Sequence, residues 1–190
     1  MKINNAIRIM DILISVLFLV ILFPLILIIY LLILFIDGKP VIFKQSRIGF
    51  NGKKFNIYKF RTMEKKILAK DSDRLTKLGS ILRRLSFDEI PQFINVLRKE
   101  MSIVGPRPLP EINERKIEKE LKVKRRTILP GITGLSQINY TGKFRTIGDK
   151  VKLDLEYCNN YTLQNYLKII TKTPLILIKR LIKNKTSIIK

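Results

Sequence analysis

Two adjacent carboxylates, Asp88 and Glu89, are the residues of this sequence best suited to take part in a chemical reaction. They lie in the run 86–92, Ser-Phe-Asp-Glu-Ile-Pro-Gln. A helix accepts proline only in its first turn, where the N–H groups have no intrahelical partner. With Asp88 as the N-cap, Pro91 falls at the third helical position. The spacing therefore predicts that the acid pair marks the start of a helix.

The electrostatic field at a helix N-terminus would affect both acids and any ligand bound near them. Its partial positive charge lowers carboxylate pKa values and attracts phosphate. Two acids would nevertheless repel a diphosphate unless a divalent cation bridged a carboxylate and a phosphate. The plainer alternative is that Asp88 only caps the helix and Glu89 only favours its dipole. The residues alone leave both interpretations open.

Basic residues in nearby segments are candidates for binding phosphate oxygens: Lys59, Arg61, Arg83 and Arg107. Arg107 stands between two prolines, which restrict its backbone. A planar guanidinium matches the geometry of phosphate oxygens. Any one of these cations could be a solvated surface charge, but a cluster beside a carboxylate pair favours phosphate binding.

The composition limits the chemistry further. The formal net charge is +22, which suits anionic partners such as phosphates or a lipid surface. The chain has no histidine, which excludes histidine acid–base catalysis and histidine metal ligands. Its single cysteine, Cys158, excludes an intramolecular disulfide.

Residues 12–36 form an apolar segment without any charge, bracketed by Asp11 and Asp37. As a straight helix it would be about 37 Å long, enough to cross a hydrocarbon core of roughly 30 Å. It is too long for a signal-peptide core and no cleavage site follows, so it is expected to remain as an anchor. Pro24 near its midpoint is a natural bend. A kinked spanning helix and a helix that enters and leaves on one face are both compatible with this.

Basic residues on both flanks of the segment bear on its orientation. Lys2 and Arg8 precede it, and a denser set follows it: Lys39, Lys44, Arg47, Lys53 and Lys54. Because basic flanks prefer the cytoplasmic side, the main domain is expected there.

The remaining residues predict mostly helices and one hairpin. Short β-like runs at 41–43 and 55–58 flank Asn51-Gly52, a strong hairpin signal. Helices are predicted at 64–85 with a break near Gly79, at 88–100, and at 111–126 as a solvated surface helix, whereas 130–134 is predicted to be a loop. The last residues, from Leu163 onward, predict either an amphipathic helix on an anionic membrane or an ordinary packing helix.

Taken together, these motifs resemble the small monotopic bacterial sugar transferases, the polyprenyl-phosphate phosphoglycosyl transferases. The resemblance covers nearly the whole chain. It rests on the apolar segment with its central proline and on Lys-Phe-Arg-Thr-Met at 59–63. It also rests on Asp-Glu-x-Pro-Gln at 88–92, Met-Ser-Ile-Val-Gly-Pro-Arg-Pro at 101–108 and Pro-Gly-Ile-Thr-Gly at 130–134.

The resemblance implies a two-step transfer of a phosphosugar from a nucleoside diphosphate sugar, of the UDP type, to polyprenol phosphate. Asp88 matches the nucleophile, which forms a covalent phosphosugar intermediate and releases nucleoside monophosphate. Glu89 matches an acid that assists the lipid phosphate, and Mg²⁺ is required with Asp88 as a ligand. Arg83 and Arg107 match arginines linked to phosphate or nucleotide binding. Such a reaction would be the first membrane step in the assembly of a polysaccharide or glycoprotein glycan.

The resemblance also favours a re-entrant membrane helix broken at Pro24. The expected fold is mainly α with a short β-hairpin. Residues 1–36 would form the membrane-embedded helix, and residues 37–190 a small cytoplasmic α/β domain with interfacial amphipathic helices. The expected location is the inner, cytoplasmic membrane of a bacterium, with the catalytic domain facing the cytoplasm.

Two departures concern the substrate pocket. Lys99 precedes Glu100 where the family usually has glycine, and Tyr140-Thr141 follows Asn139 where a glycine and an arginine are usual. Lys143 or Arg145 could replace that arginine, and neither the sugar nor the pathway follows from the sequence. A basic membrane-anchored nucleic-acid-binding protein or a non-catalytic scaffold is the alternative. The first would need a recognition module, of which the sequence shows none, and the second would be expected to lose the acid pair.

Overall fold

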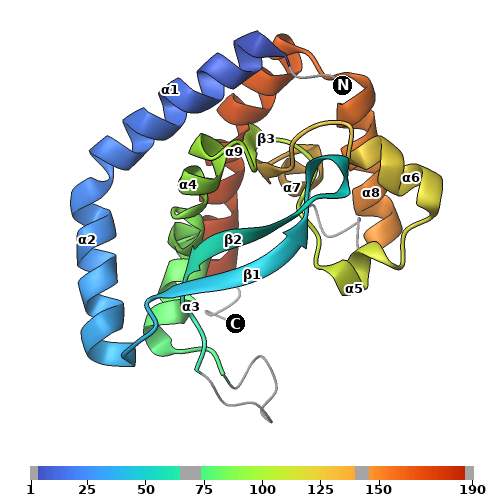
Figure 1. Cartoon of the computed structure of the whole chain (residues 1–190). Coiled ribbons are helices and arrows are strands. Elements are labelled where there is room, and N and C mark those ends of the chain that lie inside the picture. Colours follow the sequence, from blue (N-terminus) through green and yellow to red (C-terminus); the bar gives the residue numbers. More distant parts are fainter. Residues whose placement is uncertain (1–3, 65–73, 140–145, 187–190) are drawn as a thin grey trace.

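A long bent helix on one side and a body of helices and short strands make up the computed structural model (Figure 1). It describes residues 4–64, 74–139 and 146–186. The longer helices are α1 (Asn5–Ile21), α2 (Phe23–Leu32), α3 (Lys77–Leu85), α8 (Ile147–Asn159) and α9 (Leu163–Thr186). The shorter ones are α4 (Gln92–Leu97), α5 (Glu111–Glu114), α6 (Lys119–Arg125) and α7 (Leu135–Ile138). The prediction of a mainly helical fold with one short antiparallel hairpin is confirmed.

The apolar segment bends where the sequence predicts. α1 and the helical stretch Phe23–Asp37 meet at Leu22 with an angle of 60°, and Pro24 lies in the first turn of α2. Proline has no N–H to donate to the preceding turn, and its ring clashes there. The last part of the stretch, Ile33–Asp37, is a π-helical turn (η1). Within the described residues no single helix is both long and apolar enough to cross a membrane, whereas this bent pair reaches that length and composition.

Asp11, at the edge of the apolar segment, fastens α1 to the body. Its Oδ1 accepts hydrogen bonds from Ser102 Oγ at 3.0 Å, from the Ile103 amide at 2.8 Å and from the Tyr166 hydroxyl at 2.7 Å. These donors belong to a short strand and to α9, and Asp11 is fully buried between them. The acid is therefore a structural anchor as well as the limit of the apolar run.

The hairpin predicted around Asn51-Gly52 is present and is longer than its β-like runs. β1 (Ile42–Ile48) pairs antiparallel with β2 (Lys54–Phe60), and a short 3-10 turn, η2 (Phe50–Gly52), joins them. Asn51 and Gly52 both have positive φ angles, 51° and 77°, which few other residues adopt easily. The turn chemistry therefore fixes the register of the pair.

A second pair of strands corrects the prediction of a loop at 130–134. β3 (Ser102–Val104) and β4 (Gly131–Thr133) run parallel in the centre of the body. A Cβ on Gly131 would lie 2.0 Å from the amide nitrogen of Gly105, so only glycine allows this approach. Strands of three residues are too short to show a periodic pattern.

Two predicted helices have different limits. In the stretch 64–85, residues 65–73 lie outside the described part, and α3 runs through Gly79 without a break. Gly79 instead allows α3 to touch the backbone of Thr62, since a Cβ there would lie 2.2 Å from the Thr62 carbonyl oxygen. The stretch 111–126 is two short helices, α5 and α6, rather than one.

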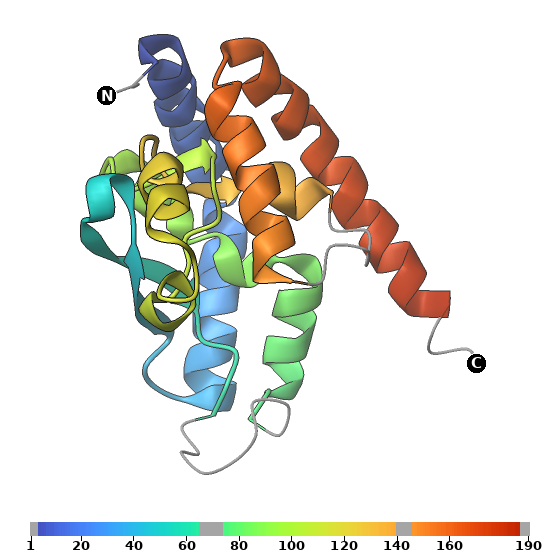
Figure 2. The ribbon, with the colours of Figure 1, turned by 90° about the vertical axis from the view of Figure 1, so that its right-hand side faces the viewer.

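The first half of α9 is a packing helix and its second half has the exposed apolar residues of an amphipathic helix. Tyr166 and Ile169 in its first half are buried against the main core. Leu175, Ile178 and Ile182 in its second half are exposed, and this half projects from the body (Figure 2). The exposed apolar residues lie at helical spacing, so the amphipathic prediction is consistent with this half, and contact with a membrane stays a prediction.

Candidate active site

The acid pair sits in a tight turn between α3 and α4. Phe87–Glu89 forms one 3-10 turn, η3, preceded by Ser86, which has a left-handed backbone with φ of 59°. α4 begins only at Gln92, with Pro91 as its N-cap. The prediction that Asp88 is the N-cap is therefore wrong. Pro91 lacks the N–H that a continuous helix would need, and the Ile90 amide bonds back only three residues, to the Phe87 carbonyl.

β2 places Lys59 beside both acids. Its Nζ lies 2.5 Å from Glu89 Oε1 and 3.9 Å from Asp88 Oδ2. The first contact is a charge-assisted hydrogen bond, and the second is an electrostatic attraction at longer range. All three side chains are largely buried, so solvent screens these interactions only partly.

Two arginines also act on the acid pair, Arg107 on Glu89 and Arg83 on Asp88. Arg107 Nη2 lies 3.6 Å from Glu89 Oε1, and its side chain is 46% exposed. Arg83, in the last turn of α3, donates from Nε to Thr62 Oγ1 at 2.8 Å, and its charge acts on the Asp88 carboxyl. Lys59, Arg83 and Arg107 are thus brought together around the two acids.

The two acids have opposite pKa shifts. Burial raises the pKa of Asp88 to about 6, against the attraction of Lys59 and with a further push from the Glu89 charge. Burial also opposes ionisation of Glu89, but the adjacent Lys59 and Arg107 hold its pKa below the usual value. The expectation that a helix terminus lowers the pKa of Asp88 is therefore wrong, because burial outweighs it. Carboxyls with diverging pKa values in one site are typical of divided catalytic roles.

Arg61 is placed differently from the other predicted cations. It is buried, and its guanidinium donates to the carbonyl oxygens of Asp37, Gly38 and Lys39. These carbonyls belong to the last residue of η1 and the two residues after it, so Arg61 fixes the point where the apolar segment joins the hairpin. A phosphate at Arg61 would have to compete with three carbonyl acceptors.

Asn95 holds β2 against α4 and was not predicted as a site residue. Its Oδ1 accepts from the Tyr58 amide at 3.1 Å, and its Nδ2 donates to the Asn56 carbonyl at 2.7 Å and to Glu100 Oε2 at 2.6 Å. The side chain is fully buried. Asn95 therefore sets the distance between the strand that carries Lys59 and the helix that follows the acid pair. Only the buried position of this amide identifies its role, and a sequence pattern does not show that.

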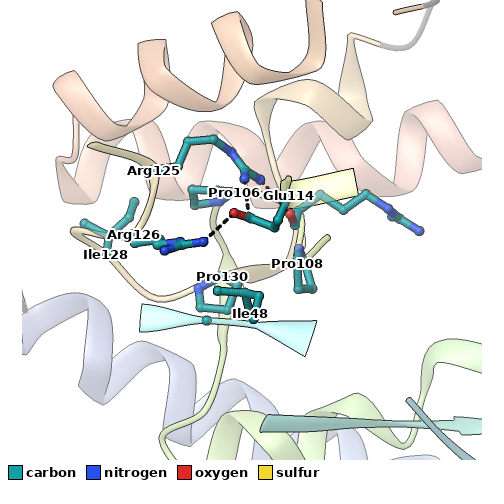
Figure 3. A pocket seen from close by; sticks show the side chains of 10 residues that line it. Ile48, Pro106, Pro108, Glu114, Arg125, Arg126, Ile128 and Pro130 are labelled. Carbon is teal, nitrogen blue, oxygen red and sulfur yellow. Dashed lines mark hydrogen bonds and ion pairs between the residues drawn. The ribbon is translucent and has the colours of Figure 1, made fainter. Parts of the chain in front are cut away.

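A buried ionic cluster supports the backbone of Arg107, and Figure 3 labels three of its members, Glu114, Arg125 and Arg126. Arg125 Nη1 lies 2.8 Å from Glu114 Oε1 and Nη2 lies 2.9 Å from Asp154 Oδ2, and Nη2 also donates to the Arg107 carbonyl at 2.8 Å. Arg126 lies 2.7 Å from Glu114 Oε2. The prediction that 111–126 is a solvated surface helix is therefore wrong for Glu114 and Arg125, because the partner Asp154 comes from the distant helix α8.

Two further candidates cannot be placed. Lys143 and Arg145, considered as substitutes for the arginine missing after Asn139, lie outside the described residues.

Comparisons with known proteins point to one family. Residues 3–180 match the family described as bacterial sugar transferase. The galactosyl transferase CpsE of Streptococcus agalactiae is 39% identical over 155 residues, which cover 72% of this chain and 34% of that protein. The uncharacterized sugar transferase EpsL of Bacillus subtilis is 43% identical over 141 residues, covering 72% of this chain and 69% of EpsL.

A third relative is the UDP-glucose:undecaprenyl-phosphate glucose-1-phosphate transferase of Escherichia coli. It is 36% identical over 178 residues, which cover 86% of this chain and 38% of that protein. The aligned part is thus little more than a third of CpsE and of the Escherichia coli protein, and about two thirds of EpsL. Because the family match includes the hairpin, the acid pair and the segment carrying Arg107, the chain belongs to the bacterial sugar transferase family.

Proposed function

We propose that this chain transfers a sugar phosphate from a nucleoside diphosphate sugar, of the UDP type, to polyprenol phosphate. The Escherichia coli relative is named for transfer from UDP-glucose to undecaprenyl phosphate, and an Aeromonas hydrophila relative for transfer of N-acetylgalactosamine phosphate to the same acceptor. These names share the acceptor and differ in the sugar. The reaction class and acceptor therefore carry over to the proposal, and the sugar stays open.

One observation carries the proposal. Asp88 is a buried carboxyl whose pKa is raised to about 6, and basic side chains surround it and Glu89. At pH 7 such a carboxylate is still mostly ionised, and it is more basic than an exposed aspartate. An ionised, desolvated carboxylate is a competent nucleophile toward phosphorus, and the cations would stabilise the charge of the transferring group.

The proposed reaction has two displacements at the sugar-bearing phosphorus. In the first, an Asp88 carboxylate oxygen bonds to phosphorus while the bond to the bridging pyrophosphate oxygen breaks, and that electron pair leaves with the nucleoside monophosphate. In the second, a lipid phosphate oxygen bonds to the same phosphorus, and the Asp88–phosphorus bond breaks and restores the carboxylate. Glu89, beside Lys59 and Arg107, would orient the lipid phosphate.

The acid pair could supply carboxylate ligands to a Mg²⁺ ion that also binds the substrate. Among the described residues no group of three or more acidic or sulfur-containing side chains could hold a metal alone. Mg²⁺ usually binds proteins through one or two carboxylates and completes its shell with water and substrate phosphates. Asp88, with Glu89 beside it, provides such a partial site, where bound Mg²⁺ would offset phosphate charge.

The bent helix and the end of α9 are the proposed membrane contacts. Val20, Phe23, Phe35 and Ile36 along the bent helix are exposed apolar residues. We expect both ends of this helix to face the cytoplasm, because both flanks are basic. An Asn5→Cys variant should resist an impermeant thiol reagent in intact cells, because residue 5 would face the cytoplasm. The native Cys158 is buried and should add no background labelling. Labelling from outside would show that the helix spans.

The contact made by α9 has its own test. Deleting the residues beyond Pro174 should weaken binding to anionic vesicles, because it removes the apolar residues 175–178 together with Lys179, Arg180 and Lys183. Unchanged binding with the same salt dependence would exclude this contact.

The decisive test of the reaction omits the acceptor. The protein is incubated with a panel of UDP-sugars, and nucleoside monophosphate release is measured together with the intact mass. One donor should release about one equivalent and add a sugar phosphate to the peptide containing Asp88. Release without an adduct would exclude the covalent route, and an adduct on Glu89 would reassign the nucleophile.

A further inference from the structure

Arg47 in β1 lies on the face of the hairpin that carries Lys59. In the register of the pair, Arg47 is opposite Phe55 and Phe43 is opposite Lys59. Cross-strand partners, and residues two apart on one strand, point to the same side of a sheet. Ile57 lies on that side and is buried in the main core. Arg47 and Lys59 therefore both point toward the body of the protein.

The strand brings Arg47 next to the segment that carries Arg107. The amide of the following residue, Ile48, bonds to the Leu109 carbonyl. Burial and then the charge of Arg107 lower the pKa of Arg47 to about 10, and the Glu89 charge acts on it in the opposite direction. By the strand register and this backbone bond, Arg47 lies on the hairpin face that carries Lys59 and beside the segment of Arg107, and it remains a cation at neutral pH.

The guanidinium of Arg47 has unused hydrogen-bond donors. Its Nη2 donates to Gln45 Oε1 at 2.5 Å, whereas its Nε is buried and has no hydrogen-bond partner among the described residues. A guanidinium has five donor hydrogens, and a buried donor without a partner is costly. A bound anion would satisfy it.

The cations are unevenly distributed between the two acids. Lys59 lies between the acids, Arg83 acts on Asp88, and both Arg107 and Arg47 act on Glu89. The Glu89 end thus has the larger excess of positive charge, and it holds the two arginines whose planar forks suit phosphate.

The proposed two-step reaction requires one anion subsite to act twice. In the first displacement the nucleoside monophosphate leaves from the side of phosphorus opposite Asp88. In the second the lipid phosphate attacks from that same side, since Asp88 is then the leaving group. We propose that Arg47 and Arg107 form this shared subsite, which holds the leaving nucleotide phosphate and then the entering lipid phosphate. The inference rests on the proposed function and assigns both phosphates to one pair of arginines.

The two half-reactions test Arg47 separately. Adduct formation is followed with the active UDP-sugar alone, and adduct discharge with undecaprenol phosphate alone after excess donor is removed. Arg47→Gln should slow each by about 10- to 100-fold, the usual range for one charge-assisted hydrogen-bonding group. Arg47→Lys, which keeps the charge but loses the fork, should slow both by a smaller factor. UMP should compete with the lipid phosphate, and its inhibition constant should rise in Arg47→Gln.

Lys44→Gln is the matched control. Lys44 lies on the same strand but on the opposite face, with its Nζ 5.7 Å from the centre of the Tyr58 ring. Its loss removes the same charge and should leave both half-reactions unchanged. Normal rates in Arg47→Gln, or a defect in one half-reaction only, would overturn the shared subsite while the Asp88 adduct still forms. Absence of any adduct in the unmodified protein would instead refute the covalent route of the proposed function.

Discussion

Two ionic clusters meet at Arg107 and differ in burial and in charge balance. On its backbone side, the side chains of Glu114, Arg125 and Asp154 are almost fully buried. Arg125 bonds both of these acids and also the Arg107 carbonyl. In front of it, the side chains of Glu89 and Lys59 are about one fifth exposed, and that of Arg107 is nearly half exposed.

The balance of acids and cations separates the two clusters more sharply than burial does. In the rear cluster the acids Glu114 and Asp154 face two arginines, Arg125 and Arg126. In the front cluster the acids are Asp88 and Glu89, and the cations around them outnumber them: Arg47, Lys59, Arg83 and Arg107. The same residue types thus build a structural support where the charges balance, and what we propose to be an anion-binding site where positive charge is in excess.

The largest effect is expected from Asp88→Asn, which should remove activity without lowering stability. Asp88→Asn should abolish adduct formation, a loss on the order of 10⁴-fold or more, because the amide is not a nucleophile. The pKa of Asp88 is raised, so the folded protein binds its proton more tightly than the unfolded chain, and the carboxylate destabilises the fold at pH 7. The unfolding temperature of Asp88→Asn should therefore stay the same or rise. A large fall in stability would give Asp88 a structural role.

A substitution in the rear cluster should lower the stability of the fold, unlike the substitution of Asp88. Arg125→Met leaves Glu114 and Asp154 buried without their shared partner, which costs about 3–5 kcal/mol and lowers the unfolding temperature by on the order of 10 °C. Thermal unfolding in detergent measures this. Arg115→Met is the control, since Arg115 is highly exposed beside Glu111 and should be neutral. Equal stability of the two variants would contradict the comparison.

Glu89→Gln sharpens the division between the two acids of the front cluster. It should still form the adduct, because Asp88 is intact, but discharge to lipid phosphate should slow by about 100-fold if Glu89 assists that step. Rapid mixing of the isolated adduct with undecaprenol phosphate measures the rate. A variant that forms no adduct would place Glu89 in the first step instead.

The pH dependence of the first step is a smaller effect and depends on burial. With an Asp88 pKa of about 6, kcat/KM for adduct formation should fall about tenfold for each pH unit well below 6, as the nucleophile is protonated. In Glu89→Gln the fall should begin at lower pH, because the Glu89 charge raises the pKa of Asp88. A profile that is flat down to pH 5 would exclude the raised pKa.

The smallest effect is expected at a short but exposed ion pair. Lys54 Nζ lies 2.8 Å from Glu111 Oε2, closer than Lys59 lies to Asp88, yet both side chains are well exposed. Lys54→Met should change neither the unfolding temperature nor the half-reactions measurably. A clear defect would show that burial and charge excess do not separate functional from incidental pairs in this protein.

The sequence by itself determined the local features. Asn51-Gly52 predicted the hairpin because its turn needs positive φ angles, and Pro24 predicted the bend because proline lacks an N–H. The candidate acids and three of their cations also followed from residue types and spacing. Each of these inferences depends on one short stretch of chain, whose chemistry is visible without its neighbours.

Only the tertiary structure decided which charged residues act together. It placed Arg47 on the hairpin face that carries Lys59, and Arg61 on backbone carbonyls, and it buried Arg125 between acids from two helices. It also raised the pKa of Asp88, against the expectation from a helix terminus. Burial and partners from distant segments control these outcomes, because the energy of a charge depends on its solvent exposure and on what surrounds it in space.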